Sequence, residues 1–94
     1  MKYYIMTIEQ YTPLGGEAKT EQSKVEKKNT YDSALSYFYN TLKTVADSAA
    51  HNFLDIKIVQ SDGGIVKKDQ YGEYDNTVAT TTQNNSGTQS SQGT

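Results

Sequence analysis

The chain contains one histidine, His51, and no cysteine, which restricts the chemistry that its side chains can support. A transition-metal site at this histidine would have to use carboxylates for all its other protein ligands. The imidazole could act as a general base, but it also follows a predicted helix. A histidine near a helix C-terminus interacts favourably with the helix dipole. We favour that structural role, and we expect no metal site and no cofactor.

The carboxylates are scattered along the chain, and none of them forms an obvious catalytic pair. A glycosidase-like reaction needs two carboxylates on either side of a cleft, and a small domain with one helix offers little cleft. The sequence Asp62-Gly63-Gly64 is similar to part of a phosphate-binding loop. However, it lacks the Gly-Lys-Ser/Thr signature and no helix is predicted after it. We therefore expect no enzymatic activity, and we interpret this segment as a turn.

The tyrosines and lysines are the side chains that best suit a binding role, since eight tyrosines in 94 residues is a high number. On a sheet face away from the helix, they could stack the bases of single-stranded nucleic acid. The same face could instead bury itself against a second copy or another protein, where tyrosine is favoured. The tyrosines could also simply fill and border a small core. The candidate binding face consists of Tyr3, Tyr4, Tyr11, Lys57, Lys67, Lys68, Tyr71 and Tyr74.

The composition argues against several other functions. Nine lysines, no arginine and eleven acidic residues give a net charge of −2, whereas proteins that grip duplex DNA are usually basic. The absence of cysteine excludes disulfides and zinc–thiolate sites. No stretch approaches the ~20 apolar residues that a membrane span needs, and the apolar run at the N-terminus is too short for a signal peptide. We expect a cytoplasmic protein with no membrane partner.

One amphipathic helix is predicted over residues 30–50, and the rest of the fold depends on it. Thr30 suits the N-cap position, and Asp32 in the first turn complements the helix dipole. His51 and Asn52 are expected to end the helix, because both residues tolerate the left-handed conformation. Steps of three and four residues place the apolar side chains on one face: Tyr31, Leu35, Phe38, Leu42, Val45 and Ala49.

Four strands are predicted around this helix, over residues 2–11, 17–29, 53–60 and 65–74. The first strand is apolar on both faces, which is typical of a central strand, and the second carries lysines and glutamates, which suit an edge. A two-residue loop at Asp62-Gly63 should join the last two strands as a hairpin. Its register predicts that Ile65 and Tyr71 share a face with Ile56 and Ile58.

Together these elements predict an α+β domain over residues 1–75. Its order is ββαββ, with one helix packed on a four-stranded antiparallel sheet. Residues 76–94 are rich in Thr, Ser, Gln, Asn and Gly and contain no charge. Such a segment cannot offset the entropy cost of ordering, so we expect a disordered C-terminal tail.

Three segments together resemble a known group of proteins. They are the opening residues 2–9, the helix start at residues 31–35 with Phe38, and the hairpin at residues 59–68. They are similar to the small nonstructural proteins of gut microviruses, which are gokushovirus-like single-stranded DNA phages. The resemblance covers residues 1–74 and implies a phage accessory protein acting in the bacterial cytoplasm. It supplies no catalytic residues, and the histidine that many members have near Tyr39 is absent.

The sequence therefore favours a non-enzymatic binding protein. We expect it to form a homo-oligomer and to contact a protein partner through the aromatic face of the sheet. The alternative is a protein that binds single-stranded nucleic acid during phage replication or packaging.

Overall fold

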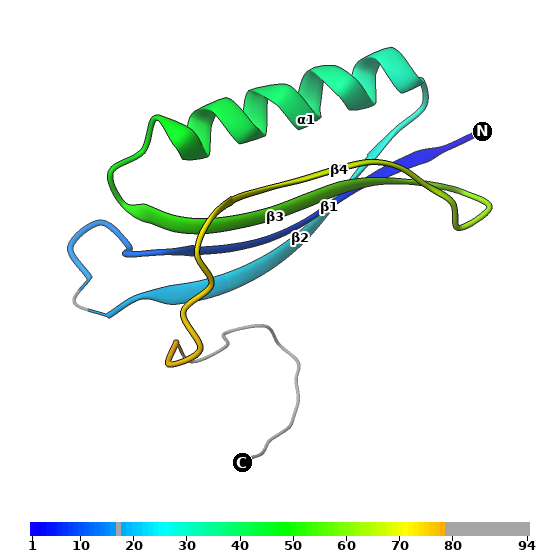
Figure 1. Cartoon of the computed structure of the whole chain (residues 1–94). Helices are drawn as coiled ribbons and strands as arrows, with labels where there is room; N and C mark the ends of the chain where they lie inside the picture. The colour runs from blue at the N-terminus through cyan, green and yellow to red at the C-terminus, as the bar shows by residue number, and fades with distance from the viewer. Residues whose placement is uncertain (17, 79–94) are drawn as a thin grey trace.

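The structure is a computed structural model, and it describes residues 1–16 and 18–78 (Figure 1). One helix lies along one face of a four-stranded sheet, and each pair of adjacent strands is antiparallel. The strand order in the sheet is β2-β1-β3-β4. The arrangement confirms the predicted ββαββ α+β fold. Along the chain the elements are β1 (Tyr3–Tyr11), β2 (Thr20–Lys28), α1 (Tyr31–Ala46), β3 (His51–Gln60) and β4 (Ile65–Gly72).

The core lies between α1 and the two central strands. The buried residues of α1 are Ala34, Phe38 and Val45. Phe38 and Val45 belong to the predicted apolar face, whose Leu35 and Leu42 are half-buried, but Ala34 was not part of that prediction, and Tyr31 and Ala49 are exposed. The three buried residues pack with Ile5 of β1 and with the buried side chains of β3. The hydroxyl of Thr30 accepts a hydrogen bond from the N–H of Ser33 at 3.1 Å, which confirms the predicted N-cap.

The helix ends earlier than the sequence suggested, because a turn interrupts it after Ala46. The N–H of Asp47 still donates to the carbonyl of Lys43, but the hydroxyl of Ser48 then accepts the N–H of Ala50 at 3.1 Å. Serine side chains often compete with helical hydrogen bonding in this way. The predicted helix limit at residue 50 was therefore wrong, and residues 51–52 do not cap α1 but begin β3.

The hairpin between β3 and β4 also differs from the predicted two-residue loop. Gly63 donates to the carbonyl of Gln60, and Gln60 donates to the carbonyl of Gly64, which makes a three-residue loop with Gly63 at a positive φ of 94°. Val59 then pairs with Ile65 but Ile58 pairs with Lys67, which leaves one extra residue in β4. This bulge turns Ile65 to the face opposite Ile58, so the prediction for Ile65 was wrong. Tyr71, beyond the bulge, pairs with Leu54 on the helix side as predicted.

The described part of the chain continues beyond β4. Gly72 has a φ of 74°, and after it residues 73–78 cross the face of the sheet that α1 leaves uncovered (Figure 1). We call residues 73–78 the crossing segment. It extends past the predicted domain boundary at residue 75, and residues 79–94 of the predicted tail lie outside the described residues.

Candidate functional site: the open face of the sheet

The sheet has a covered face and an open face, and strand alternation assigns each side chain to one of them. Ile5 and Thr7 of β1 are buried on the helix side, whereas Met6 and Ile8 between and after them are exposed. The strand registers extend this assignment across the sheet. The open face consists of three rows that run across the strands in the order β2, β1, β3, β4. They are Lys27-Tyr4-Val59-Ile65, Val25-Met6-Lys57-Lys68 and Ser23-Ile8-Asp55-Gln70.

Four apolar side chains of the open face are exposed. The exposed fractions are 39% for Met6, 37% for Ile8, 60% for Val25 and 55% for Ile65. Met6, Ile8 and Val25 are neighbours on β1 and β2, and Ile65 on β4 is connected to them through the half-buried Val59 of β3. A contiguous exposed apolar patch, in contrast to scattered apolar residues, is typical of an interaction surface.

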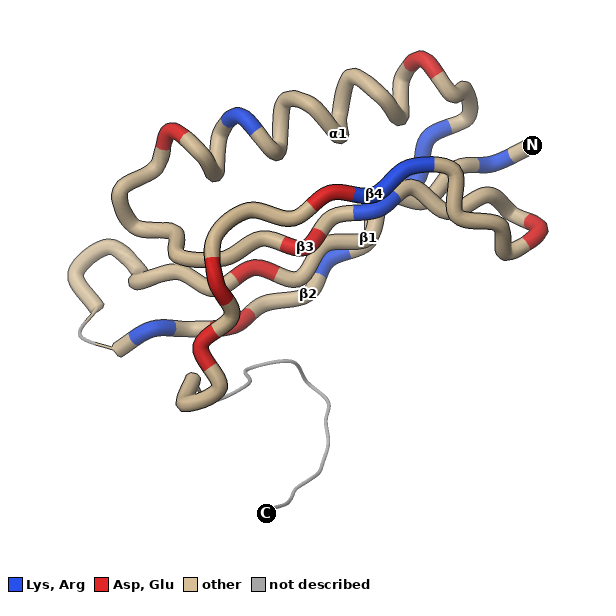
Figure 2. Tube along the Cα trace, in the orientation of Figure 1, with Lys and Arg blue, Asp and Glu red and all other residues tan. Residues whose placement is uncertain are grey.

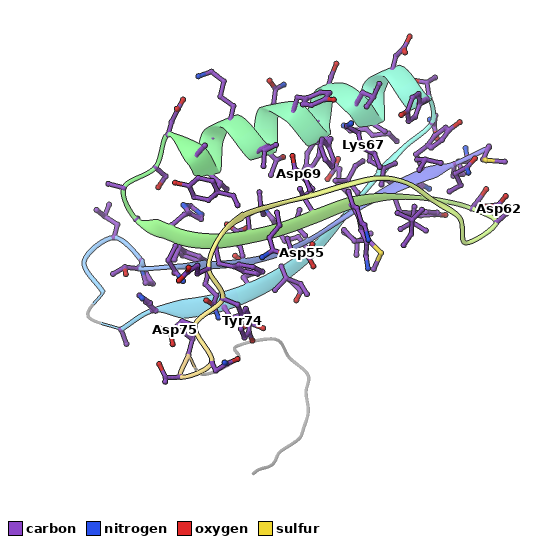
Figure 3. All side chains as sticks on the ribbon, viewed as in Figure 1. Asp55, Asp62, Lys67, Asp69, Tyr74 and Asp75 are labelled. Carbon is purple, nitrogen blue, oxygen red and sulfur yellow. The ribbon has the colours of Figure 1, made fainter. Side chains whose placement is uncertain are left out.

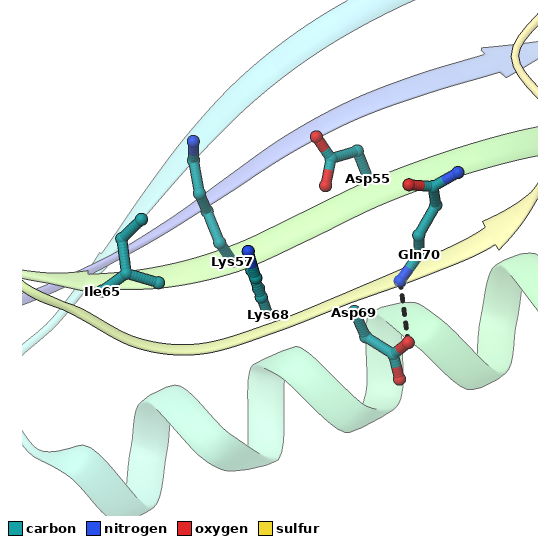
Figure 4. A pocket seen from close by; sticks show the side chains of 6 residues that line it. All are labelled: Asp55, Lys57, Ile65, Lys68, Asp69 and Gln70. Carbon is teal, nitrogen blue, oxygen red and sulfur yellow. Dashed lines mark hydrogen bonds between the residues drawn. The ribbon is translucent and has the colours of Figure 1, made fainter.

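Lysines interrupt this patch at its centre. Lys57 and Lys68 are directly opposite each other on β3 and β4, an arrangement that repels. They line a hollow of ≈ 430 Å³ together with Ile65, Gln70 and two carboxylates of the same chain, Asp55 and Asp69 (Figure 4). None of the ion pairs found within residues 1–16 and 18–78 involves either lysine. A carboxylate supplied from outside would relieve their repulsion.

The crossing segment closes the open face beyond the third row. The side-chain amide of Gln10, which is fully buried, donates to the carbonyl of Asp75 at 2.9 Å. Its oxygen accepts the N–H of Asp75, also at 2.9 Å. The ring of Tyr74 meets the ring of Phe53 edge-on, with centroids 5.1 Å apart. The segment therefore covers what would otherwise be a fourth row (Figure 3).

Two titratable groups of the crossing segment have strongly shifted pKa values. The hydroxyl of Tyr74 donates to Glu21 at 2.6 Å, and this hydrogen bond, aided by burial, raises the pKa of Tyr74 to about 12. Hydrogen bonds from Thr77, followed by the one from Lys19, lower the pKa of Asp75 to about 2. Tyr74 therefore stays neutral, and Asp75 stays ionised, throughout the physiological range.

The shift at Tyr74 predicts a loss of stability at high pH. Because its folded pKa exceeds the ordinary value of 10.0, the hydrogen bond to Glu21 contributes fully below pH 10. Its contribution should disappear as the pH rises towards 12. We expect Tyr74→Phe to lower the unfolding midpoint at pH 8, and the difference from wild type to vanish near pH 12. Urea unfolding of both proteins at several pH values measures this. A difference that stayed constant with pH would contradict it.

The structure divides the predicted binding residues between the two faces. Tyr4, Lys57 and Lys68 lie on the open face, and Tyr74 lies beside it on the crossing segment. The helix side holds the other four. Tyr3 and Tyr71 pack against the core, Tyr11 stacks on His51, and Lys67 lies over the rings of Phe38 and Tyr39.

The apolar side chains of the open face are thus mainly aliphatic, with Tyr4 as the one aromatic residue in the three rows, whereas an aromatic face was expected. Met6 and Ile8 have the same parity in β1 as Tyr4, so the alternation of the first strand already indicated them. Val25 was visible as the one large apolar residue of its strand. Ile65 had no such signal, because the bulge at Val66 decides its face.

His51 does not lie at the end of α1, as predicted, but begins β3 and bridges two side chains. Its Nε2 lies 2.7 Å from Glu9 Oε1, and its Nδ1 lies 2.9 Å from Ser48 Oγ. Its ring packs against Tyr11, with centroids 5.3 Å apart. Since Ser48 Oγ also accepts the N–H of Ala50, the serine holds the turn that leads into β3. Both ring nitrogens of His51 therefore have a polar partner, Glu9 at Nε2 and Ser48 at Nδ1.

Residues 1–16 and 18–78 contain no group of three or more His, Cys, Asp or Glu side chains placed to hold a metal ion. No helix in the described part of the chain is long and apolar enough to span a membrane. Comparisons with protein-family models, with curated proteins and with solved structures found no match to this chain.

Proposed function

We propose that this chain is a non-enzymatic binding protein that self-associates through the open face of its sheet. The observation that carries the proposal is the set of exposed apolar side chains on that face, which no element of the described chain covers. Burying apolar surface contributes roughly 25 cal/mol for each Å² removed from water. A second copy that covers this face would bury the same patch twice.

The edges of the sheet suit association less well than its face. β2 carries glutamates and lysines along one edge, and β4 at the other edge has a bulge at Val66 followed by Lys67 and Lys68. Charged side chains and bulges discourage strands of two molecules from pairing. Contact through the face therefore has fewer obstacles than extension of the sheet.

The biological setting that we propose follows from the resemblance to microvirus nonstructural proteins. In that setting the protein is a phage accessory factor in the bacterial cytoplasm. Its self-associated form would contact host proteins or the phage machinery for replication and capsid assembly.

Single-stranded nucleic-acid binding is the second candidate, because Lys27, Lys57 and Lys68 share the open face with Tyr4. Lysines around a stacking aromatic ring are typical of such proteins. However, Tyr4 is the only aromatic side chain in the three rows, and successive bases need several stacking platforms. The aliphatic character of the rows favours a protein partner.

Placing a charge at the centre of the patch should separate the copies. Three rows of four strands cover a surface of about 20 by 19 Å. This area is small compared with the ~800 Å² that each partner buries in a standard interface. We therefore expect a dimer with a dissociation constant in the micromolar range. In Ile8→Lys the constant should rise at least tenfold, because the new ammonium would be buried against apolar side chains. Light scattering during size-exclusion chromatography, over a range of protein concentrations, measures this.

Leu14→Lys is the matched control, since Leu14 is fully exposed in the loop between β1 and β2. This variant should associate as the wild type does. A wild type that remains monomeric at high micromolar concentration would overturn the proposal. If that monomer also bound a single-stranded oligonucleotide at low salt and released the oligonucleotide as salt increased, nucleic-acid binding would replace self-association as the proposed function.

A further inference from the structure

The charges of the open face are separated along the strand direction (Figure 2). The two rows nearest the hairpin of β3 and β4 contain only lysines as charged residues, and we call them the basic half: Lys27, Lys57 and Lys68. The third row and the crossing segment form the acidic half, with Lys19 bound to Asp75 at its margin. Its acidic residues are Asp55 in the third row and Glu73 and Asp75 in the crossing segment.

Symmetry limits how two such faces can meet. A two-fold axis that relates two sheets packed face to face must lie in the plane between them. If the axis ran along the strands, each row would lie over the same row of the other copy, and the basic halves would repel. If the axis runs across the strands, the order of the rows is reversed. The basic half of each copy then lies over the acidic half of the other.

We propose that two copies associate in this reversed order, with the axis between the second and third rows. This inference rests on the proposed self-association and specifies its geometry. Lys57 of each copy then contacts Asp55 of the other, because both residues belong to β3 and lie in adjacent rows. Met6 likewise lies over Ile8 of the other copy. Each dimer contains these contacts twice.

The reciprocal contact also explains the arrangement of Lys57 and Lys68. Their mutual repulsion within one copy is relieved by the carboxylate of Asp55 from the other copy, which enters the hollow that they line (Figure 4). Complementary charges at an interface mainly determine which arrangement forms, while apolar burial supplies affinity. Lys57 and Asp55 are therefore the specificity determinants of the contact.

Charge reversal tests the geometry. In Lys57→Asp alone, each dimer would have two pairs of facing carboxylates, and in Asp55→Lys alone two pairs of facing ammonium groups. We expect each variant to dimerise at least tenfold more weakly than the wild type. A mixture of the two variants should form a heterodimer of nearly wild-type affinity, since both of its contacts join a lysine to an aspartate. Sedimentation velocity of each variant and of the equimolar mixture measures this.

The equimolar mixture of the two variants distinguishes a lysine–aspartate contact between two copies from one within a single copy. Lys57 and Asp55 are two residues apart on the same face, so a contact within the chain would be lost in both variants and mixing would not restore it. The matched control is the exposed pair Lys43 and Asp47 on α1, which form an ion pair of 2.7 Å. Reversing either of these charges should leave dimerisation unchanged.

Three outcomes distinguish this inference from the function on which it rests. Recovery of the dimer in the mixture supports the reversed order. A wild-type dimer that Ile8→Lys disrupts, but that neither charge reversal weakens, keeps the proposed function and overturns the reversed order. A monomeric wild type overturns both. Circular dichroism of each variant establishes that a lost dimer is not a lost fold.

Discussion

Phe38→Ala should remove a large part of the stability of this domain. Phe38 is fully buried at the centre of the helix–sheet interface, and truncating such a ring typically costs about 3–5 kcal/mol. A domain of this size is usually stable by about 4–11 kcal/mol. The variant should therefore unfold at a much lower urea concentration. Urea titration followed by far-ultraviolet circular dichroism, at one fixed protein concentration, measures the change.

The neighbouring residue provides the control for this prediction. Tyr39 is 51% exposed, forms a T-shaped ring pair with Phe38 and lies under the ammonium of Lys67. Tyr39→Ala removes a ring of similar size from the same helix but leaves no cavity, so we expect it to cost about 1 kcal/mol or less. If the two variants lost equal stability, α1 would not be held to the sheet through Phe38.

Gly72→Ala should have the second largest effect, because it acts on the point where β4 leads into the crossing segment. A Cβ at this position would collide with the carbonyl oxygen of Asn52 and lie 2.9 Å from its carbonyl carbon. The φ of 74° adds a conformational cost of about 1–2 kcal/mol, and overpacking against backbone adds about 1–3 kcal/mol. We expect a loss of about 2–5 kcal/mol, or release of the crossing segment.

Gly63→Ala separates these two contributions. Gly63 also has a positive φ, of 94°, but nothing lies within 4 Å of the position that a Cβ would occupy there. This variant should therefore show the conformational cost alone. Limited proteolysis adds a second measurement, since a released crossing segment exposes Phe53 and should be cleaved near residue 73. Equal losses of unfolding free energy in Gly72→Ala and Gly63→Ala would show that the collision with Asn52 is relieved at little energetic cost.

The crossing segment also affects how the open face can be used. It covers Phe53 and occupies the side-chain amide of Gln10, so three rows remain for a partner. It also adds carboxylates to the end of the face that is already acidic. In the proposed dimer the crossing segment therefore limits the size of the interface and increases the separation of charge that selects its geometry.

Local patterns in the sequence were sufficient to predict the fold. The spacing of Phe38 and Val45 indicates one buried helix face, and Thr30 marks where the helix begins. Alternation in β1 and β3, with a charged second strand, indicates a sheet with β2 at an edge. These features depend on interactions between residues close in the chain, or on the burial of one face, and both leave a periodic pattern.

The composition of the binding face depended on contacts that leave no such pattern. A single extra residue at Val66 moves Ile65 to the open face, and strand register places Tyr3 and Tyr71 on the covered one. Gln10 meets Asp75 across 65 residues of sequence, and no periodicity indicates such a pair. Secondary structure was therefore determined by the sequence locally. Which side chains lie on the open face was decided by strand register, the bulge at Val66 and the crossing segment, because these follow from packing of the whole domain.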